Sequence, residues 1–353
     1  MSPFRLFSLQ SSIQEKIMVH LEMVEIFRLS LCSKTAKEKF TTLWALSGGE
    51  SVMRITKQDM GNDNVVELAF DYRRGRDAPG RQISVFFACS RDELYQDMNS
   101  GSIRIVNGNR MVFTRVTIHP DGPYGCKTEQ PENDALILAS YLSELFSCEL
   151  DAFQLELNFL GIADMKKVLA HDILHGVKFF EISQGTVSHK EMRKILVTFK
   201  PKMMMVFCKT WPNFKCRKVI EVTDSLKIFD ATWFKLVHLF KVRCPKISLQ
   251  SPILTVQDLN EFVNQWLLRN DKTLEWLHIT GCETLTSTAI DTPNRVQNFD
   301  PAAYRTSFHR EGVVIDYTSG YTVIRNSDNT TATCVHFETG GHHNFLFVVW
   351  ETA

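Results

Sequence analysis

The sequence has no excess of charge of either sign. Its 353 residues include 40 lysines and arginines and 40 aspartates and glutamates. Proteins that bind nucleic acids or acidic membranes usually carry a basic surplus, so we expect neither kind of partner. There is also no apolar run of membrane-spanning length, and the first residues lack the basic-then-apolar pattern of a signal peptide. These absences predict a cytoplasmic or nuclear protein with no membrane segment.

Paired cysteines and catalytic motifs are missing as well. The nine cysteines are scattered, and no two form a Cys-x-x-Cys pair, which indicates reduced thiols. No Gly-x-Ser-x-Gly elbow occurs, and no glycine-rich phosphate loop ends in Lys-Ser or Lys-Thr. We therefore expect a protein that is not an enzyme and that holds no cofactor. The alternative is a hydrolase hidden in an α/β region, which would require a nucleophile and a base within hydrogen-bonding reach.

One cluster near the C-terminus has the residue types of a metal site. Cys334, His336, His342 and His343 lie close together, and thiolate and imidazole are good zinc ligands. Their spacing matches no standard zinc pattern. We expect no metal here.

What the sequence does have is a helical start. Ser12 and Glu15 form a capping box that predicts the beginning of a first helix. Residues 24–32 predict a second helix, and residues 34–40 a third that Ser33 can cap. The first helix repeats apolar residues at helical spacing, namely Ile13, Ile17 and Leu21. So few residues cannot bury every apolar side chain among themselves. The surplus packs either on another protein or on the rest of the chain, with the helices serving as a cap.

The pattern of this start resembles an F-box. The resemblance is carried by Leu6, Ile13, Ile17, Leu21, the acidic Glu25 and the run Leu29-Ser30-Leu31-Cys32-Ser33-Lys34. Phe40 would take the place of the tryptophan that the family often has on its third helix. The resemblance implies that residues 3–42 bind the Skp-type adaptor of a cullin-based ubiquitin ligase. The implied adaptor-binding residues are Leu6, Phe7, Ile13, Ile17, Leu21, Ile26, Leu29, Leu31, Cys32 and Lys34.

Residues 50–146 predict a β-rich segment that ends in a helix over 134–146. Asn107-Gly108 predicts a tight hairpin, because both residues tolerate positive φ angles. Residues 119–131, rich in proline and glycine, are expected to form a loop. The expected strands are 51–55, 65–72, 83–89, 103–106 and 111–118.

From Leu150 onwards the chain follows a repeat. Leu150, Phe153, Leu155, Asn158 and Leu160 fit the leucine-rich-repeat pattern, which alternates strands and helices. We expect leucine-rich-repeat-like units over residues 147–290, with an ordinary α/β domain as the alternative. The expected helices are 163–170, 188–199 and 256–268, the last capped by Thr255.

A second resemblance lies inside this region. Residues 254–262, Trp266 and residues 274–277 resemble the type 2 F-box-associated region, and the likeness extends over about 199–277. That region follows an F-box in a group of receptor-like proteins, and the order is the same here. Trp276 faces away from Leu277 on its strand, so we expect Trp276 to be exposed and to contact a bound target protein.

Residues 300–353 return to strands, which we expect to be antiparallel and to close the end of the repeat stack. The predicted fold class is mixed α+β or α/β, with an F-box, repeats and flanking antiparallel strands. The predicted function is the substrate-recognition subunit of a Skp-cullin-F-box ubiquitin ligase, whose partners are the adaptor, the cullin scaffold and an unknown protein substrate. The alternative is a protein-binding repeat module without coupling to a ligase.

Overall fold

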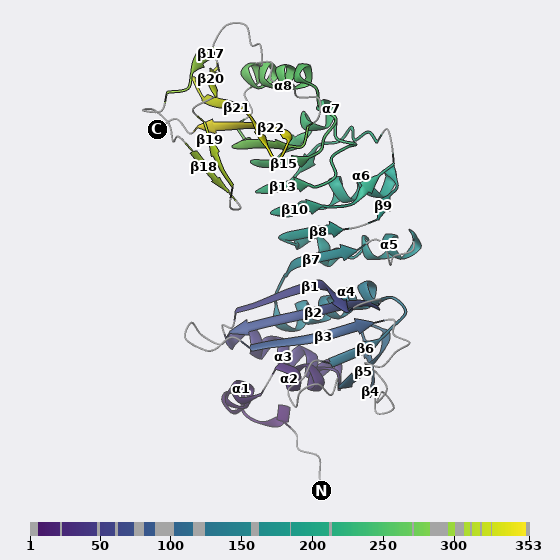
Figure 1. Ribbon diagram of the computed structural model, residues 1–353. Helices are drawn as coiled ribbons and strands as arrows, with labels where there is room; N and C mark the ends of the chain where they lie inside the picture. Colours follow the sequence, from purple (N-terminus) through teal and green to yellow (C-terminus); the bar gives the residue numbers. More distant parts are fainter. Residues whose placement is uncertain are drawn as a thin grey trace. The chain divides into compact units, whose positions relative to one another are not determined.

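The structure is a computed structural model, and it forms two compact units, Met1–Phe180 and Glu181–Ala353 (Figure 1). It is a mixed α/β protein in which each unit contributes a sheet with parallel and antiparallel strands. The residues that the structure describes are 6–21, 23–47, 50–60, 63–73, 81–88, 102–115, 124–156, 162–183, 185–211, 214–269, 272–282, 296–300, 307–310, 313–317, 320–325 and 327–350.

The first unit begins with three helices, as predicted. They are α1 (Ser11–His20), α2 (Met23–Ser30) and α3 (Lys34–Ser47), preceded by a 3-10 turn, η1 (Leu6–Ser8). Ser33 caps α3, since its Oγ accepts a hydrogen bond of 3.0 Å from the backbone N–H of Ala36. α3 continues past the predicted end at Phe40, because its apolar face repeats once more with the buried Leu43 and Trp44.

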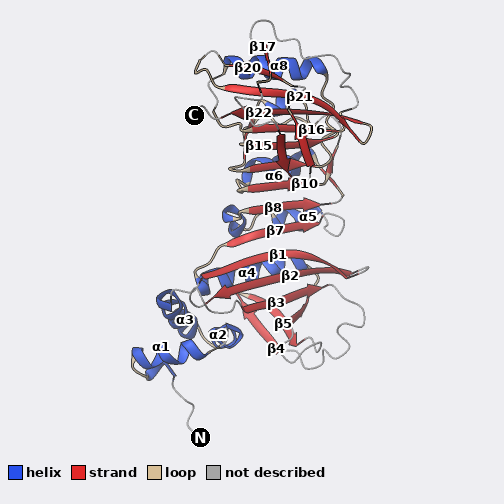
Figure 2. Ribbon diagram, turned by 60° about the vertical axis from the view of Figure 1, so that its left-hand side comes forward, coloured by secondary structure: helices blue, strands red, loops and turns tan. Residues whose placement is uncertain are grey.

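The sheet of the first unit has the strand order β7-β1-β2-β3-β6-β5-β4. The strands are β1 (Glu50–Met60), β2 (Asp63–Arg73), β3 (Arg81–Ala88), β4 (Ser102–Val106), β5 (Asn109–Arg115), β6 (Tyr124–Lys127) and β7 (Leu150–Glu156). The helix α4 (Pro131–Phe146) packs on β1, β2 and β3 (Figure 2). Phe146 ties this layer together, because its ring contacts those of Phe70 on β2 and Trp44 on α3.

Two predictions for this sheet had different outcomes. The hairpin at Asn107-Gly108 is confirmed, with φ angles of 46° and 81° and with Val106 paired to Asn109. The loop predicted over 119–131 is wrong at Tyr124–Lys127, which forms β6, while residues 119–123 lie outside the described residues. β6 is held by strands from elsewhere, β3 in parallel and β5 in antiparallel, and this pairing leaves no periodic signal in four residues.

The second unit is built on a parallel ladder. β10 (Met203–Val206), β13 (Ser225–Ile228), β15 (Lys246–Gln250) and β16 (Trp276–Thr280) run parallel, and β8 (Phe179–Ser183) lies next to β10. Two helices accompany these strands, α6 (His189–Thr198) and α8 (Val256–Leu268). A further helix, α5 (Ile162–Val168), follows β7 in the first unit.

The helix α8 has the bounds and the cap that the sequence predicts. The backbone N–H of Asp258 donates to Thr255 Oγ1 (3.2 Å), and the N–H of Thr255 donates to Asp258 Oδ2 (2.8 Å). This reciprocal pair is a capping box, and it satisfies two N–H groups that the helix itself leaves unpaired.

The leucine-rich-repeat-like pattern is not confirmed. No helix occurs among the described residues between β10 and β13, where only β11 (Lys209–Thr210) and β12 (Ile220–Glu221) form. Between β13 and β15 the only described helix is α7 (Leu236–Leu239), followed by β14 (Val242–Arg243). The parallel strands are therefore present, but between β10 and β15 the described residues form only the four-residue α7 where full repeat helices were expected.

An antiparallel set of strands extends the ladder at β16, as predicted. β22 (His342–Trp350) pairs antiparallel with β16, with Leu277 opposite Phe347. β21 (Thr331–Thr339), β20 (Tyr321–Ile324) and β17 (Val296–Asn298) follow in that order, and β18 (Ser307–Arg310) and β19 (Val313–Asp316) form a separate hairpin. Gly340 and Gly341 join β21 to β22 with φ angles of 61° and 76°.

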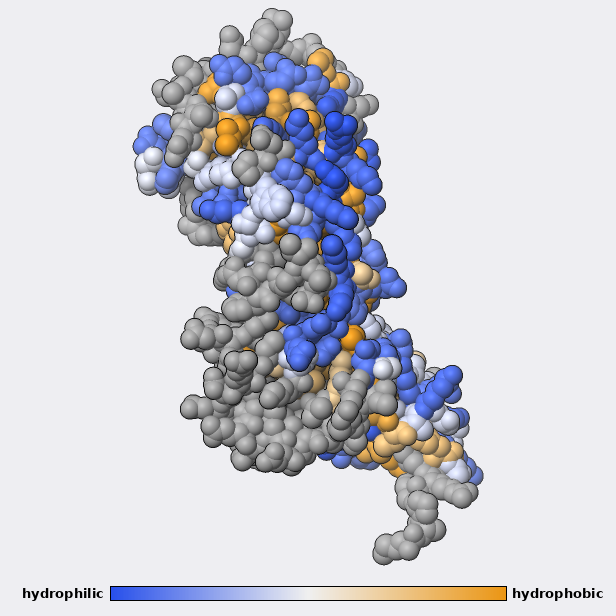
Figure 3. All heavy atoms as spheres, turned by 90° about the vertical axis from the view of Figure 1, so that its right-hand side faces the viewer, coloured by the Kyte–Doolittle hydropathy of each residue, from blue (hydrophilic) through white to orange (hydrophobic). Residues whose placement is uncertain are grey.

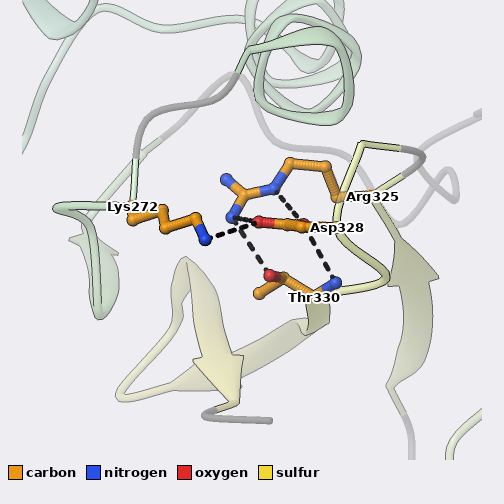
Figure 4. A network of polar contacts seen from close by, with 4 residues as sticks. All are labelled: Lys272, Arg325, Asp328 and Thr330. Atoms are coloured by element: carbon orange, nitrogen blue, oxygen red, sulfur yellow. Dashed lines mark hydrogen bonds and ion pairs between the residues drawn. The ribbon is translucent and has the colours of Figure 1, made fainter.

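A buried arginine fixes the turn between β20 and β21 (Figure 4). Arg325 is only 2% exposed, and it donates from Nε and Nη2 to the two carboxylate oxygens of Asp328, at 2.9 and 2.8 Å. The same Nη2 donates to Thr330 Oγ1 (3.1 Å), and the guanidinium lies 4.7 Å from the centre of the Trp266 ring on α8. Arg325 holds the pKa of the Asp328 carboxyl well below its usual range. This arginine therefore joins the C-terminal strands to α8.

Candidate functional site

The N-terminal helices are the first candidate site, and they are anchored on α4. Tyr141 of α4 donates a hydrogen bond of 2.8 Å from its hydroxyl to Ser30 Oγ, and its ring contacts Phe27 at 6.0 Å. Lys37 lies 4.4 Å from the centre of the same ring and forms an ion pair with Glu144. Burial raises the pKa of Tyr141, so its hydroxyl stays protonated and can donate.

The interior of the three helices is closed by α2 and α3. Ile26 and Phe40 are fully buried. The Phe7 ring meets Phe40 edge-on, with 5.3 Å between their centres. Gln14 keeps this turn in place, because its amide donates to the backbone oxygens of Leu9 (2.7 Å) and Phe7 (3.3 Å). Ile26, predicted to touch an adaptor, is therefore a core residue of this structure, on a helix that packs on α3 and α4.

Other apolar residues of the same helices stay at the surface. Ile13 on α1 is 43% exposed and Leu29 on α2 is 37% exposed. Hydrophobic residues gather over these helices at the lower right of Figure 3. Among the other predicted adaptor contacts, Phe7, Ile17, Leu21 and Leu31 are partly buried, Cys32 and Lys34 are exposed, and the side chain of Leu6 lies outside the described set. Part of the apolar surplus therefore packs on α4, as one of the two expectations has it. The rest faces solvent, and its packing on another protein stays a prediction.

The structure adds a residue that the sequence interpretation missed. Trp44 lies on α3, although the expected third helix ended at Phe40 and was thought to lack a tryptophan. Trp44 is buried against Phe146 of α4, with 4.9 Å between ring centres. Leu43 and Trp44 follow Phe40 at helical spacing of three and four residues, and this apolar spacing is the sequence signal for the longer helix.

The second candidate is a face of the parallel ladder. Along β10 and β15 the side chains alternate between buried and more exposed positions, and on β13 Lys227 is partly exposed between the buried Leu226 and Ile228. Met203, Met205, Lys227 and Ser248 lie on the partly exposed face. The buried face consists of Met204, Val206, Leu226, Ile228, Ile247 and Leu249. The partly exposed face is a strand-lined surface of the second unit.

Trp276 does not belong to that open face. It is 6% exposed, so the prediction that it is exposed is wrong. It does point away from Leu277, as expected, but on β16 this side of the sheet is covered. Trp276 lies in a buried cluster with Phe299, Tyr317, Val335, Leu346 and Val348. The covering rings come from residues far along the chain, which strand alternation alone does not reveal.

Thiol and metal chemistry find little support among the described residues. Burial raises the pKa of Cys208 to about 12 and that of Cys244 to about 11, so these thiols stay protonated and are poor nucleophiles. Within the described ranges, no three His, Cys, Asp or Glu side chains lie close enough to hold a metal ion.

A cavity of about 50 Å³ lies beside Phe262 and Trp266 of α8, far below the several hundred Å³ of a typical small-molecule site. A second cavity, of about 670 Å³, is lined by residues that include Glu144, Lys167 and His171, and it is largely open to solvent.

Among the helices that the structure describes, none is long and apolar enough to cross a membrane.

Comparison with known proteins points to the second unit. Residues 212–279 match the protein family described as F-box associated. This stretch contains β13, β15, α8 and β16, and it overlaps the region for which the resemblance was predicted, so that part of the prediction is confirmed. Uncharacterized protein F59B2.9 of Caenorhabditis elegans is 21% identical over 357 residues, which cover 98% of this chain and 79% of that protein. No solved structure matches the chain.

Proposed function

We propose that this chain is the substrate-recognition subunit of a Skp-cullin-F-box ubiquitin ligase. In this proposal α1, α2 and α3 bind the Skp-type adaptor, through which the chain joins the cullin scaffold. The second unit binds a target protein whose identity is unknown. The chain itself would carry out no chemical step.

One observation carries the proposal. A region of the F-box-associated family lies downstream of a three-helix unit whose apolar residues Ile13 and Leu29 face solvent. Exposed apolar residues on a small helical unit are typical of a surface that another protein covers. The F-box-associated match gives this surface a specific expected partner, the adaptor.

The physical basis of adaptor binding would be apolar burial. Fully burying a leucine or isoleucine side chain stabilises a complex by roughly 1.5–3 kcal/mol, so a few such anchors suffice for a stable contact. Ile13 and Leu29 would be the anchors. Phe7, Ile17, Leu21 and Leu31 would add their exposed parts, with Cys32 and Lys34 at the rim. Ubiquitin transfer would follow from proximity, since a bound target is held at high effective concentration near the ubiquitin donor.

A pull-down of the full-length chain with a Skp-type adaptor tests the proposal. Leu29→Asp and Leu31→Asp should each reduce adaptor recovery by at least about tenfold, because docking would bury an unpaired charge. Ile253→Asp is the matched control, since Ile253 is 60% exposed on the second unit and has no role in adaptor binding.

If both variants recover adaptor at the wild-type level, these helices are not the docking site. If the wild-type chain recovers no adaptor, the alternative of a binding module without ligase coupling is favoured. We also propose a cytoplasmic or nuclear location, which the unpaired state of the described cysteines supports.

A further inference from the structure

The second unit contains a strongly basic stretch inside an electrically neutral chain. Residues 185–218 include nine lysines and arginines and a single acidic residue, Glu191. Glu191 is buried, and its carboxylate accepts a hydrogen bond of 3.1 Å from the backbone N–H of Ser188 in the capping box of α6. Its carboxylate therefore belongs to the cap of α6, and it forms no ion pair with the exposed cations among the described residues.

Some of these cations have partners within the unit. Lys200 pairs with Glu221 at 2.5 Å, and Lys209 pairs with Asp230 at 3.5 Å. Six exposed cations of this stretch form no ion pair among the described residues. We call five of them the basic patch: Lys190, Arg193, Lys215, Arg217 and Lys218; the sixth, Lys202, lies directly before β10. Figure 3 views the molecule from the side on which α6 lies in Figure 1, and hydrophilic residues cover much of the surface there.

The basic patch is brought together by contacts between α6 and residues 214–218. Arg193 on α6 donates from Nη2 to the backbone oxygen of Lys215 (3.3 Å). Along residues 214–217 the side chains alternate, with Phe214 and Cys216 buried and Lys215 and Arg217 exposed. Phe214 stacks at 5.7 Å on His238, and the backbone N–H of Cys216 donates to His238 Nε2 (3.2 Å). The exposed cations are therefore presented by a segment whose alternate residues are fixed in the core.

An exposed tryptophan adjoins the basic patch. Trp211 is 57% exposed, and its backbone oxygen accepts a hydrogen bond of 3.0 Å from Nε2 of His189, the first residue of α6. The centre of the His189 ring also lies 5.6 Å from that of Phe214, which directly precedes Lys215 of the basic patch. Tryptophan and arginine are the residue types most enriched among the dominant contacts of protein interfaces.

We propose that the basic patch, together with Trp211, docks an acidic segment of a protein partner that is rich in aspartate and glutamate. The charge is complementary, since the five cations of the basic patch form no ion pair among the described residues. Trp211 supplies the apolar anchor that a purely electrostatic contact lacks. A nucleic acid fits less well, because the chain as a whole has no net positive charge. This inference rests on the proposed function, in which the second unit binds the target, and it specifies the chemistry of that target.

Fluorescence anisotropy with the full-length chain tests the inference. The probe is a labelled Asp-Glu repeat peptide of about ten residues that contains one leucine, and the control probe is the matching Asn-Gln peptide. We expect the acidic probe to bind at least about tenfold more tightly than the neutral one. Arg217→Glu/Lys218→Glu should weaken acidic-probe binding by at least about tenfold, and Trp211→Ala by about threefold or more. The matched control is Lys166→Glu/Lys241→Glu, two exposed lysines outside the basic patch, which should leave binding unchanged.

Several outcomes would overturn the inference. Absence of acidic-probe binding at low salt would do so, as would equal binding by the wild-type chain and the Arg217→Glu/Lys218→Glu variant, with circular dichroism showing that the variant is folded. Tighter binding of an oligouridylate RNA, or of phosphatidylserine vesicles, that the same charge reversal abolishes would assign the basic patch to another class of partner. The adaptor pull-down separates this inference from the proposed function. Arg217→Glu/Lys218→Glu should still recover adaptor, and Leu29→Asp should still bind the acidic probe.

Discussion

The two candidate binding surfaces differ in the kind of side chain that they expose to solvent. The N-terminal helices expose apolar side chains, Ile13 and Leu29. The basic patch, beside Trp211, exposes cations that form no ion pair within the described part of the chain. Burial of apolar area depends weakly on salt, while contact between exposed charges is screened within about 8–10 Å at physiological ionic strength. One chain can therefore hold a permanent partner by the first kind of surface and a regulated partner by the second. The difference can be tested, because a different buried residue supports each surface: Ile26 in the N-terminal helices and Phe214 beneath the basic patch.

The largest effect is expected at the anchor of the basic patch. Phe214→Ala removes a fully buried ring that contacts Trp233 and His238. The free energy of unfolding of the second unit should fall by about 3–5 kcal/mol. Acidic-probe binding should be lost while adaptor recovery is retained. Denaturant titration followed by tryptophan fluorescence measures the first effect, and loss of adaptor recovery in this variant would show that the surfaces are not independent.

The corresponding buried residue of the N-terminal helices is Ile26, where we expect adaptor binding to be lost and acidic-probe binding to be retained. Ile26→Ala should destabilise these helices by about 2–5 kcal/mol, because Ile26 is fully buried. Leu29→Ala, three residues further along α2, should cost less than about 1 kcal/mol and yet weaken adaptor binding more than it weakens the fold. Hydrogen exchange of the α2 amides separates the two effects. Equal protection in both variants would mean that Leu29 is as much a core residue as Ile26.

Salt is expected to have a smaller but more selective effect. Raising the salt concentration from about 50 to about 200 mM should weaken acidic-probe binding by about tenfold and adaptor binding by less than about threefold. Anisotropy and surface plasmon resonance at a series of salt concentrations measure the two slopes. Parallel slopes would remove the distinction between the surfaces.

The smallest effect is expected from acid. Burial, together with the smaller effect of the nearby positive charge of Lys235, lowers the pKa of His238 to about 4. The folded state therefore binds protons less readily than the unfolded state, whose histidine titrates near about 6.5. The resulting stability is present above pH of about 6.5 and is lost as the pH falls towards about 4. A protonated ring cannot accept the hydrogen bond from Cys216, so acid should loosen the segment that carries Lys215 and Arg217.

Thermal melts of the second unit between pH of about 7 and about 5 check this prediction. The melting temperature should fall in the wild-type chain and fall less in His238→Phe, which cannot be protonated. The same slope in both chains would assign the pH dependence to other groups.

Local features of the fold could be predicted from the sequence, and those that depend on distant residues could not. Thr255 and Asp258 lie within one helical turn, so the start of α8 follows from its own residues. The burial of Trp276 depends on Phe299 and Tyr317, which lie more than 20 residues further along the chain. β6 exists because β3 and β5 flank it. In both cases the sequence did not show which distant residues would become neighbours in the folded chain.

The candidate sites show the same division. The apolar spacing of the N-terminal helices marks Ile13 and Leu29, but spacing does not distinguish them from Ile26, which is fully buried. The run of cations in residues 185–218 is visible in the sequence, yet their grouping requires the contact of Arg193 with Lys215. The sequence therefore shows which residues could form a binding surface, and packing determines which of them stay exposed.

The clamp of Arg325 on Trp266 has a practical consequence for anyone who expresses part of this chain. The F-box-associated match ends at residue 279, whereas Trp266 and Phe262 on α8 pack against Phe347, and Arg325 covers the Trp266 ring. A fragment cut at the limit of the match would leave α8 without the side chains that cover its aromatic residues, and the free edge of β16 without β22. Such a truncation should aggregate, whereas a fragment that continues through Trp350 keeps the whole arrangement.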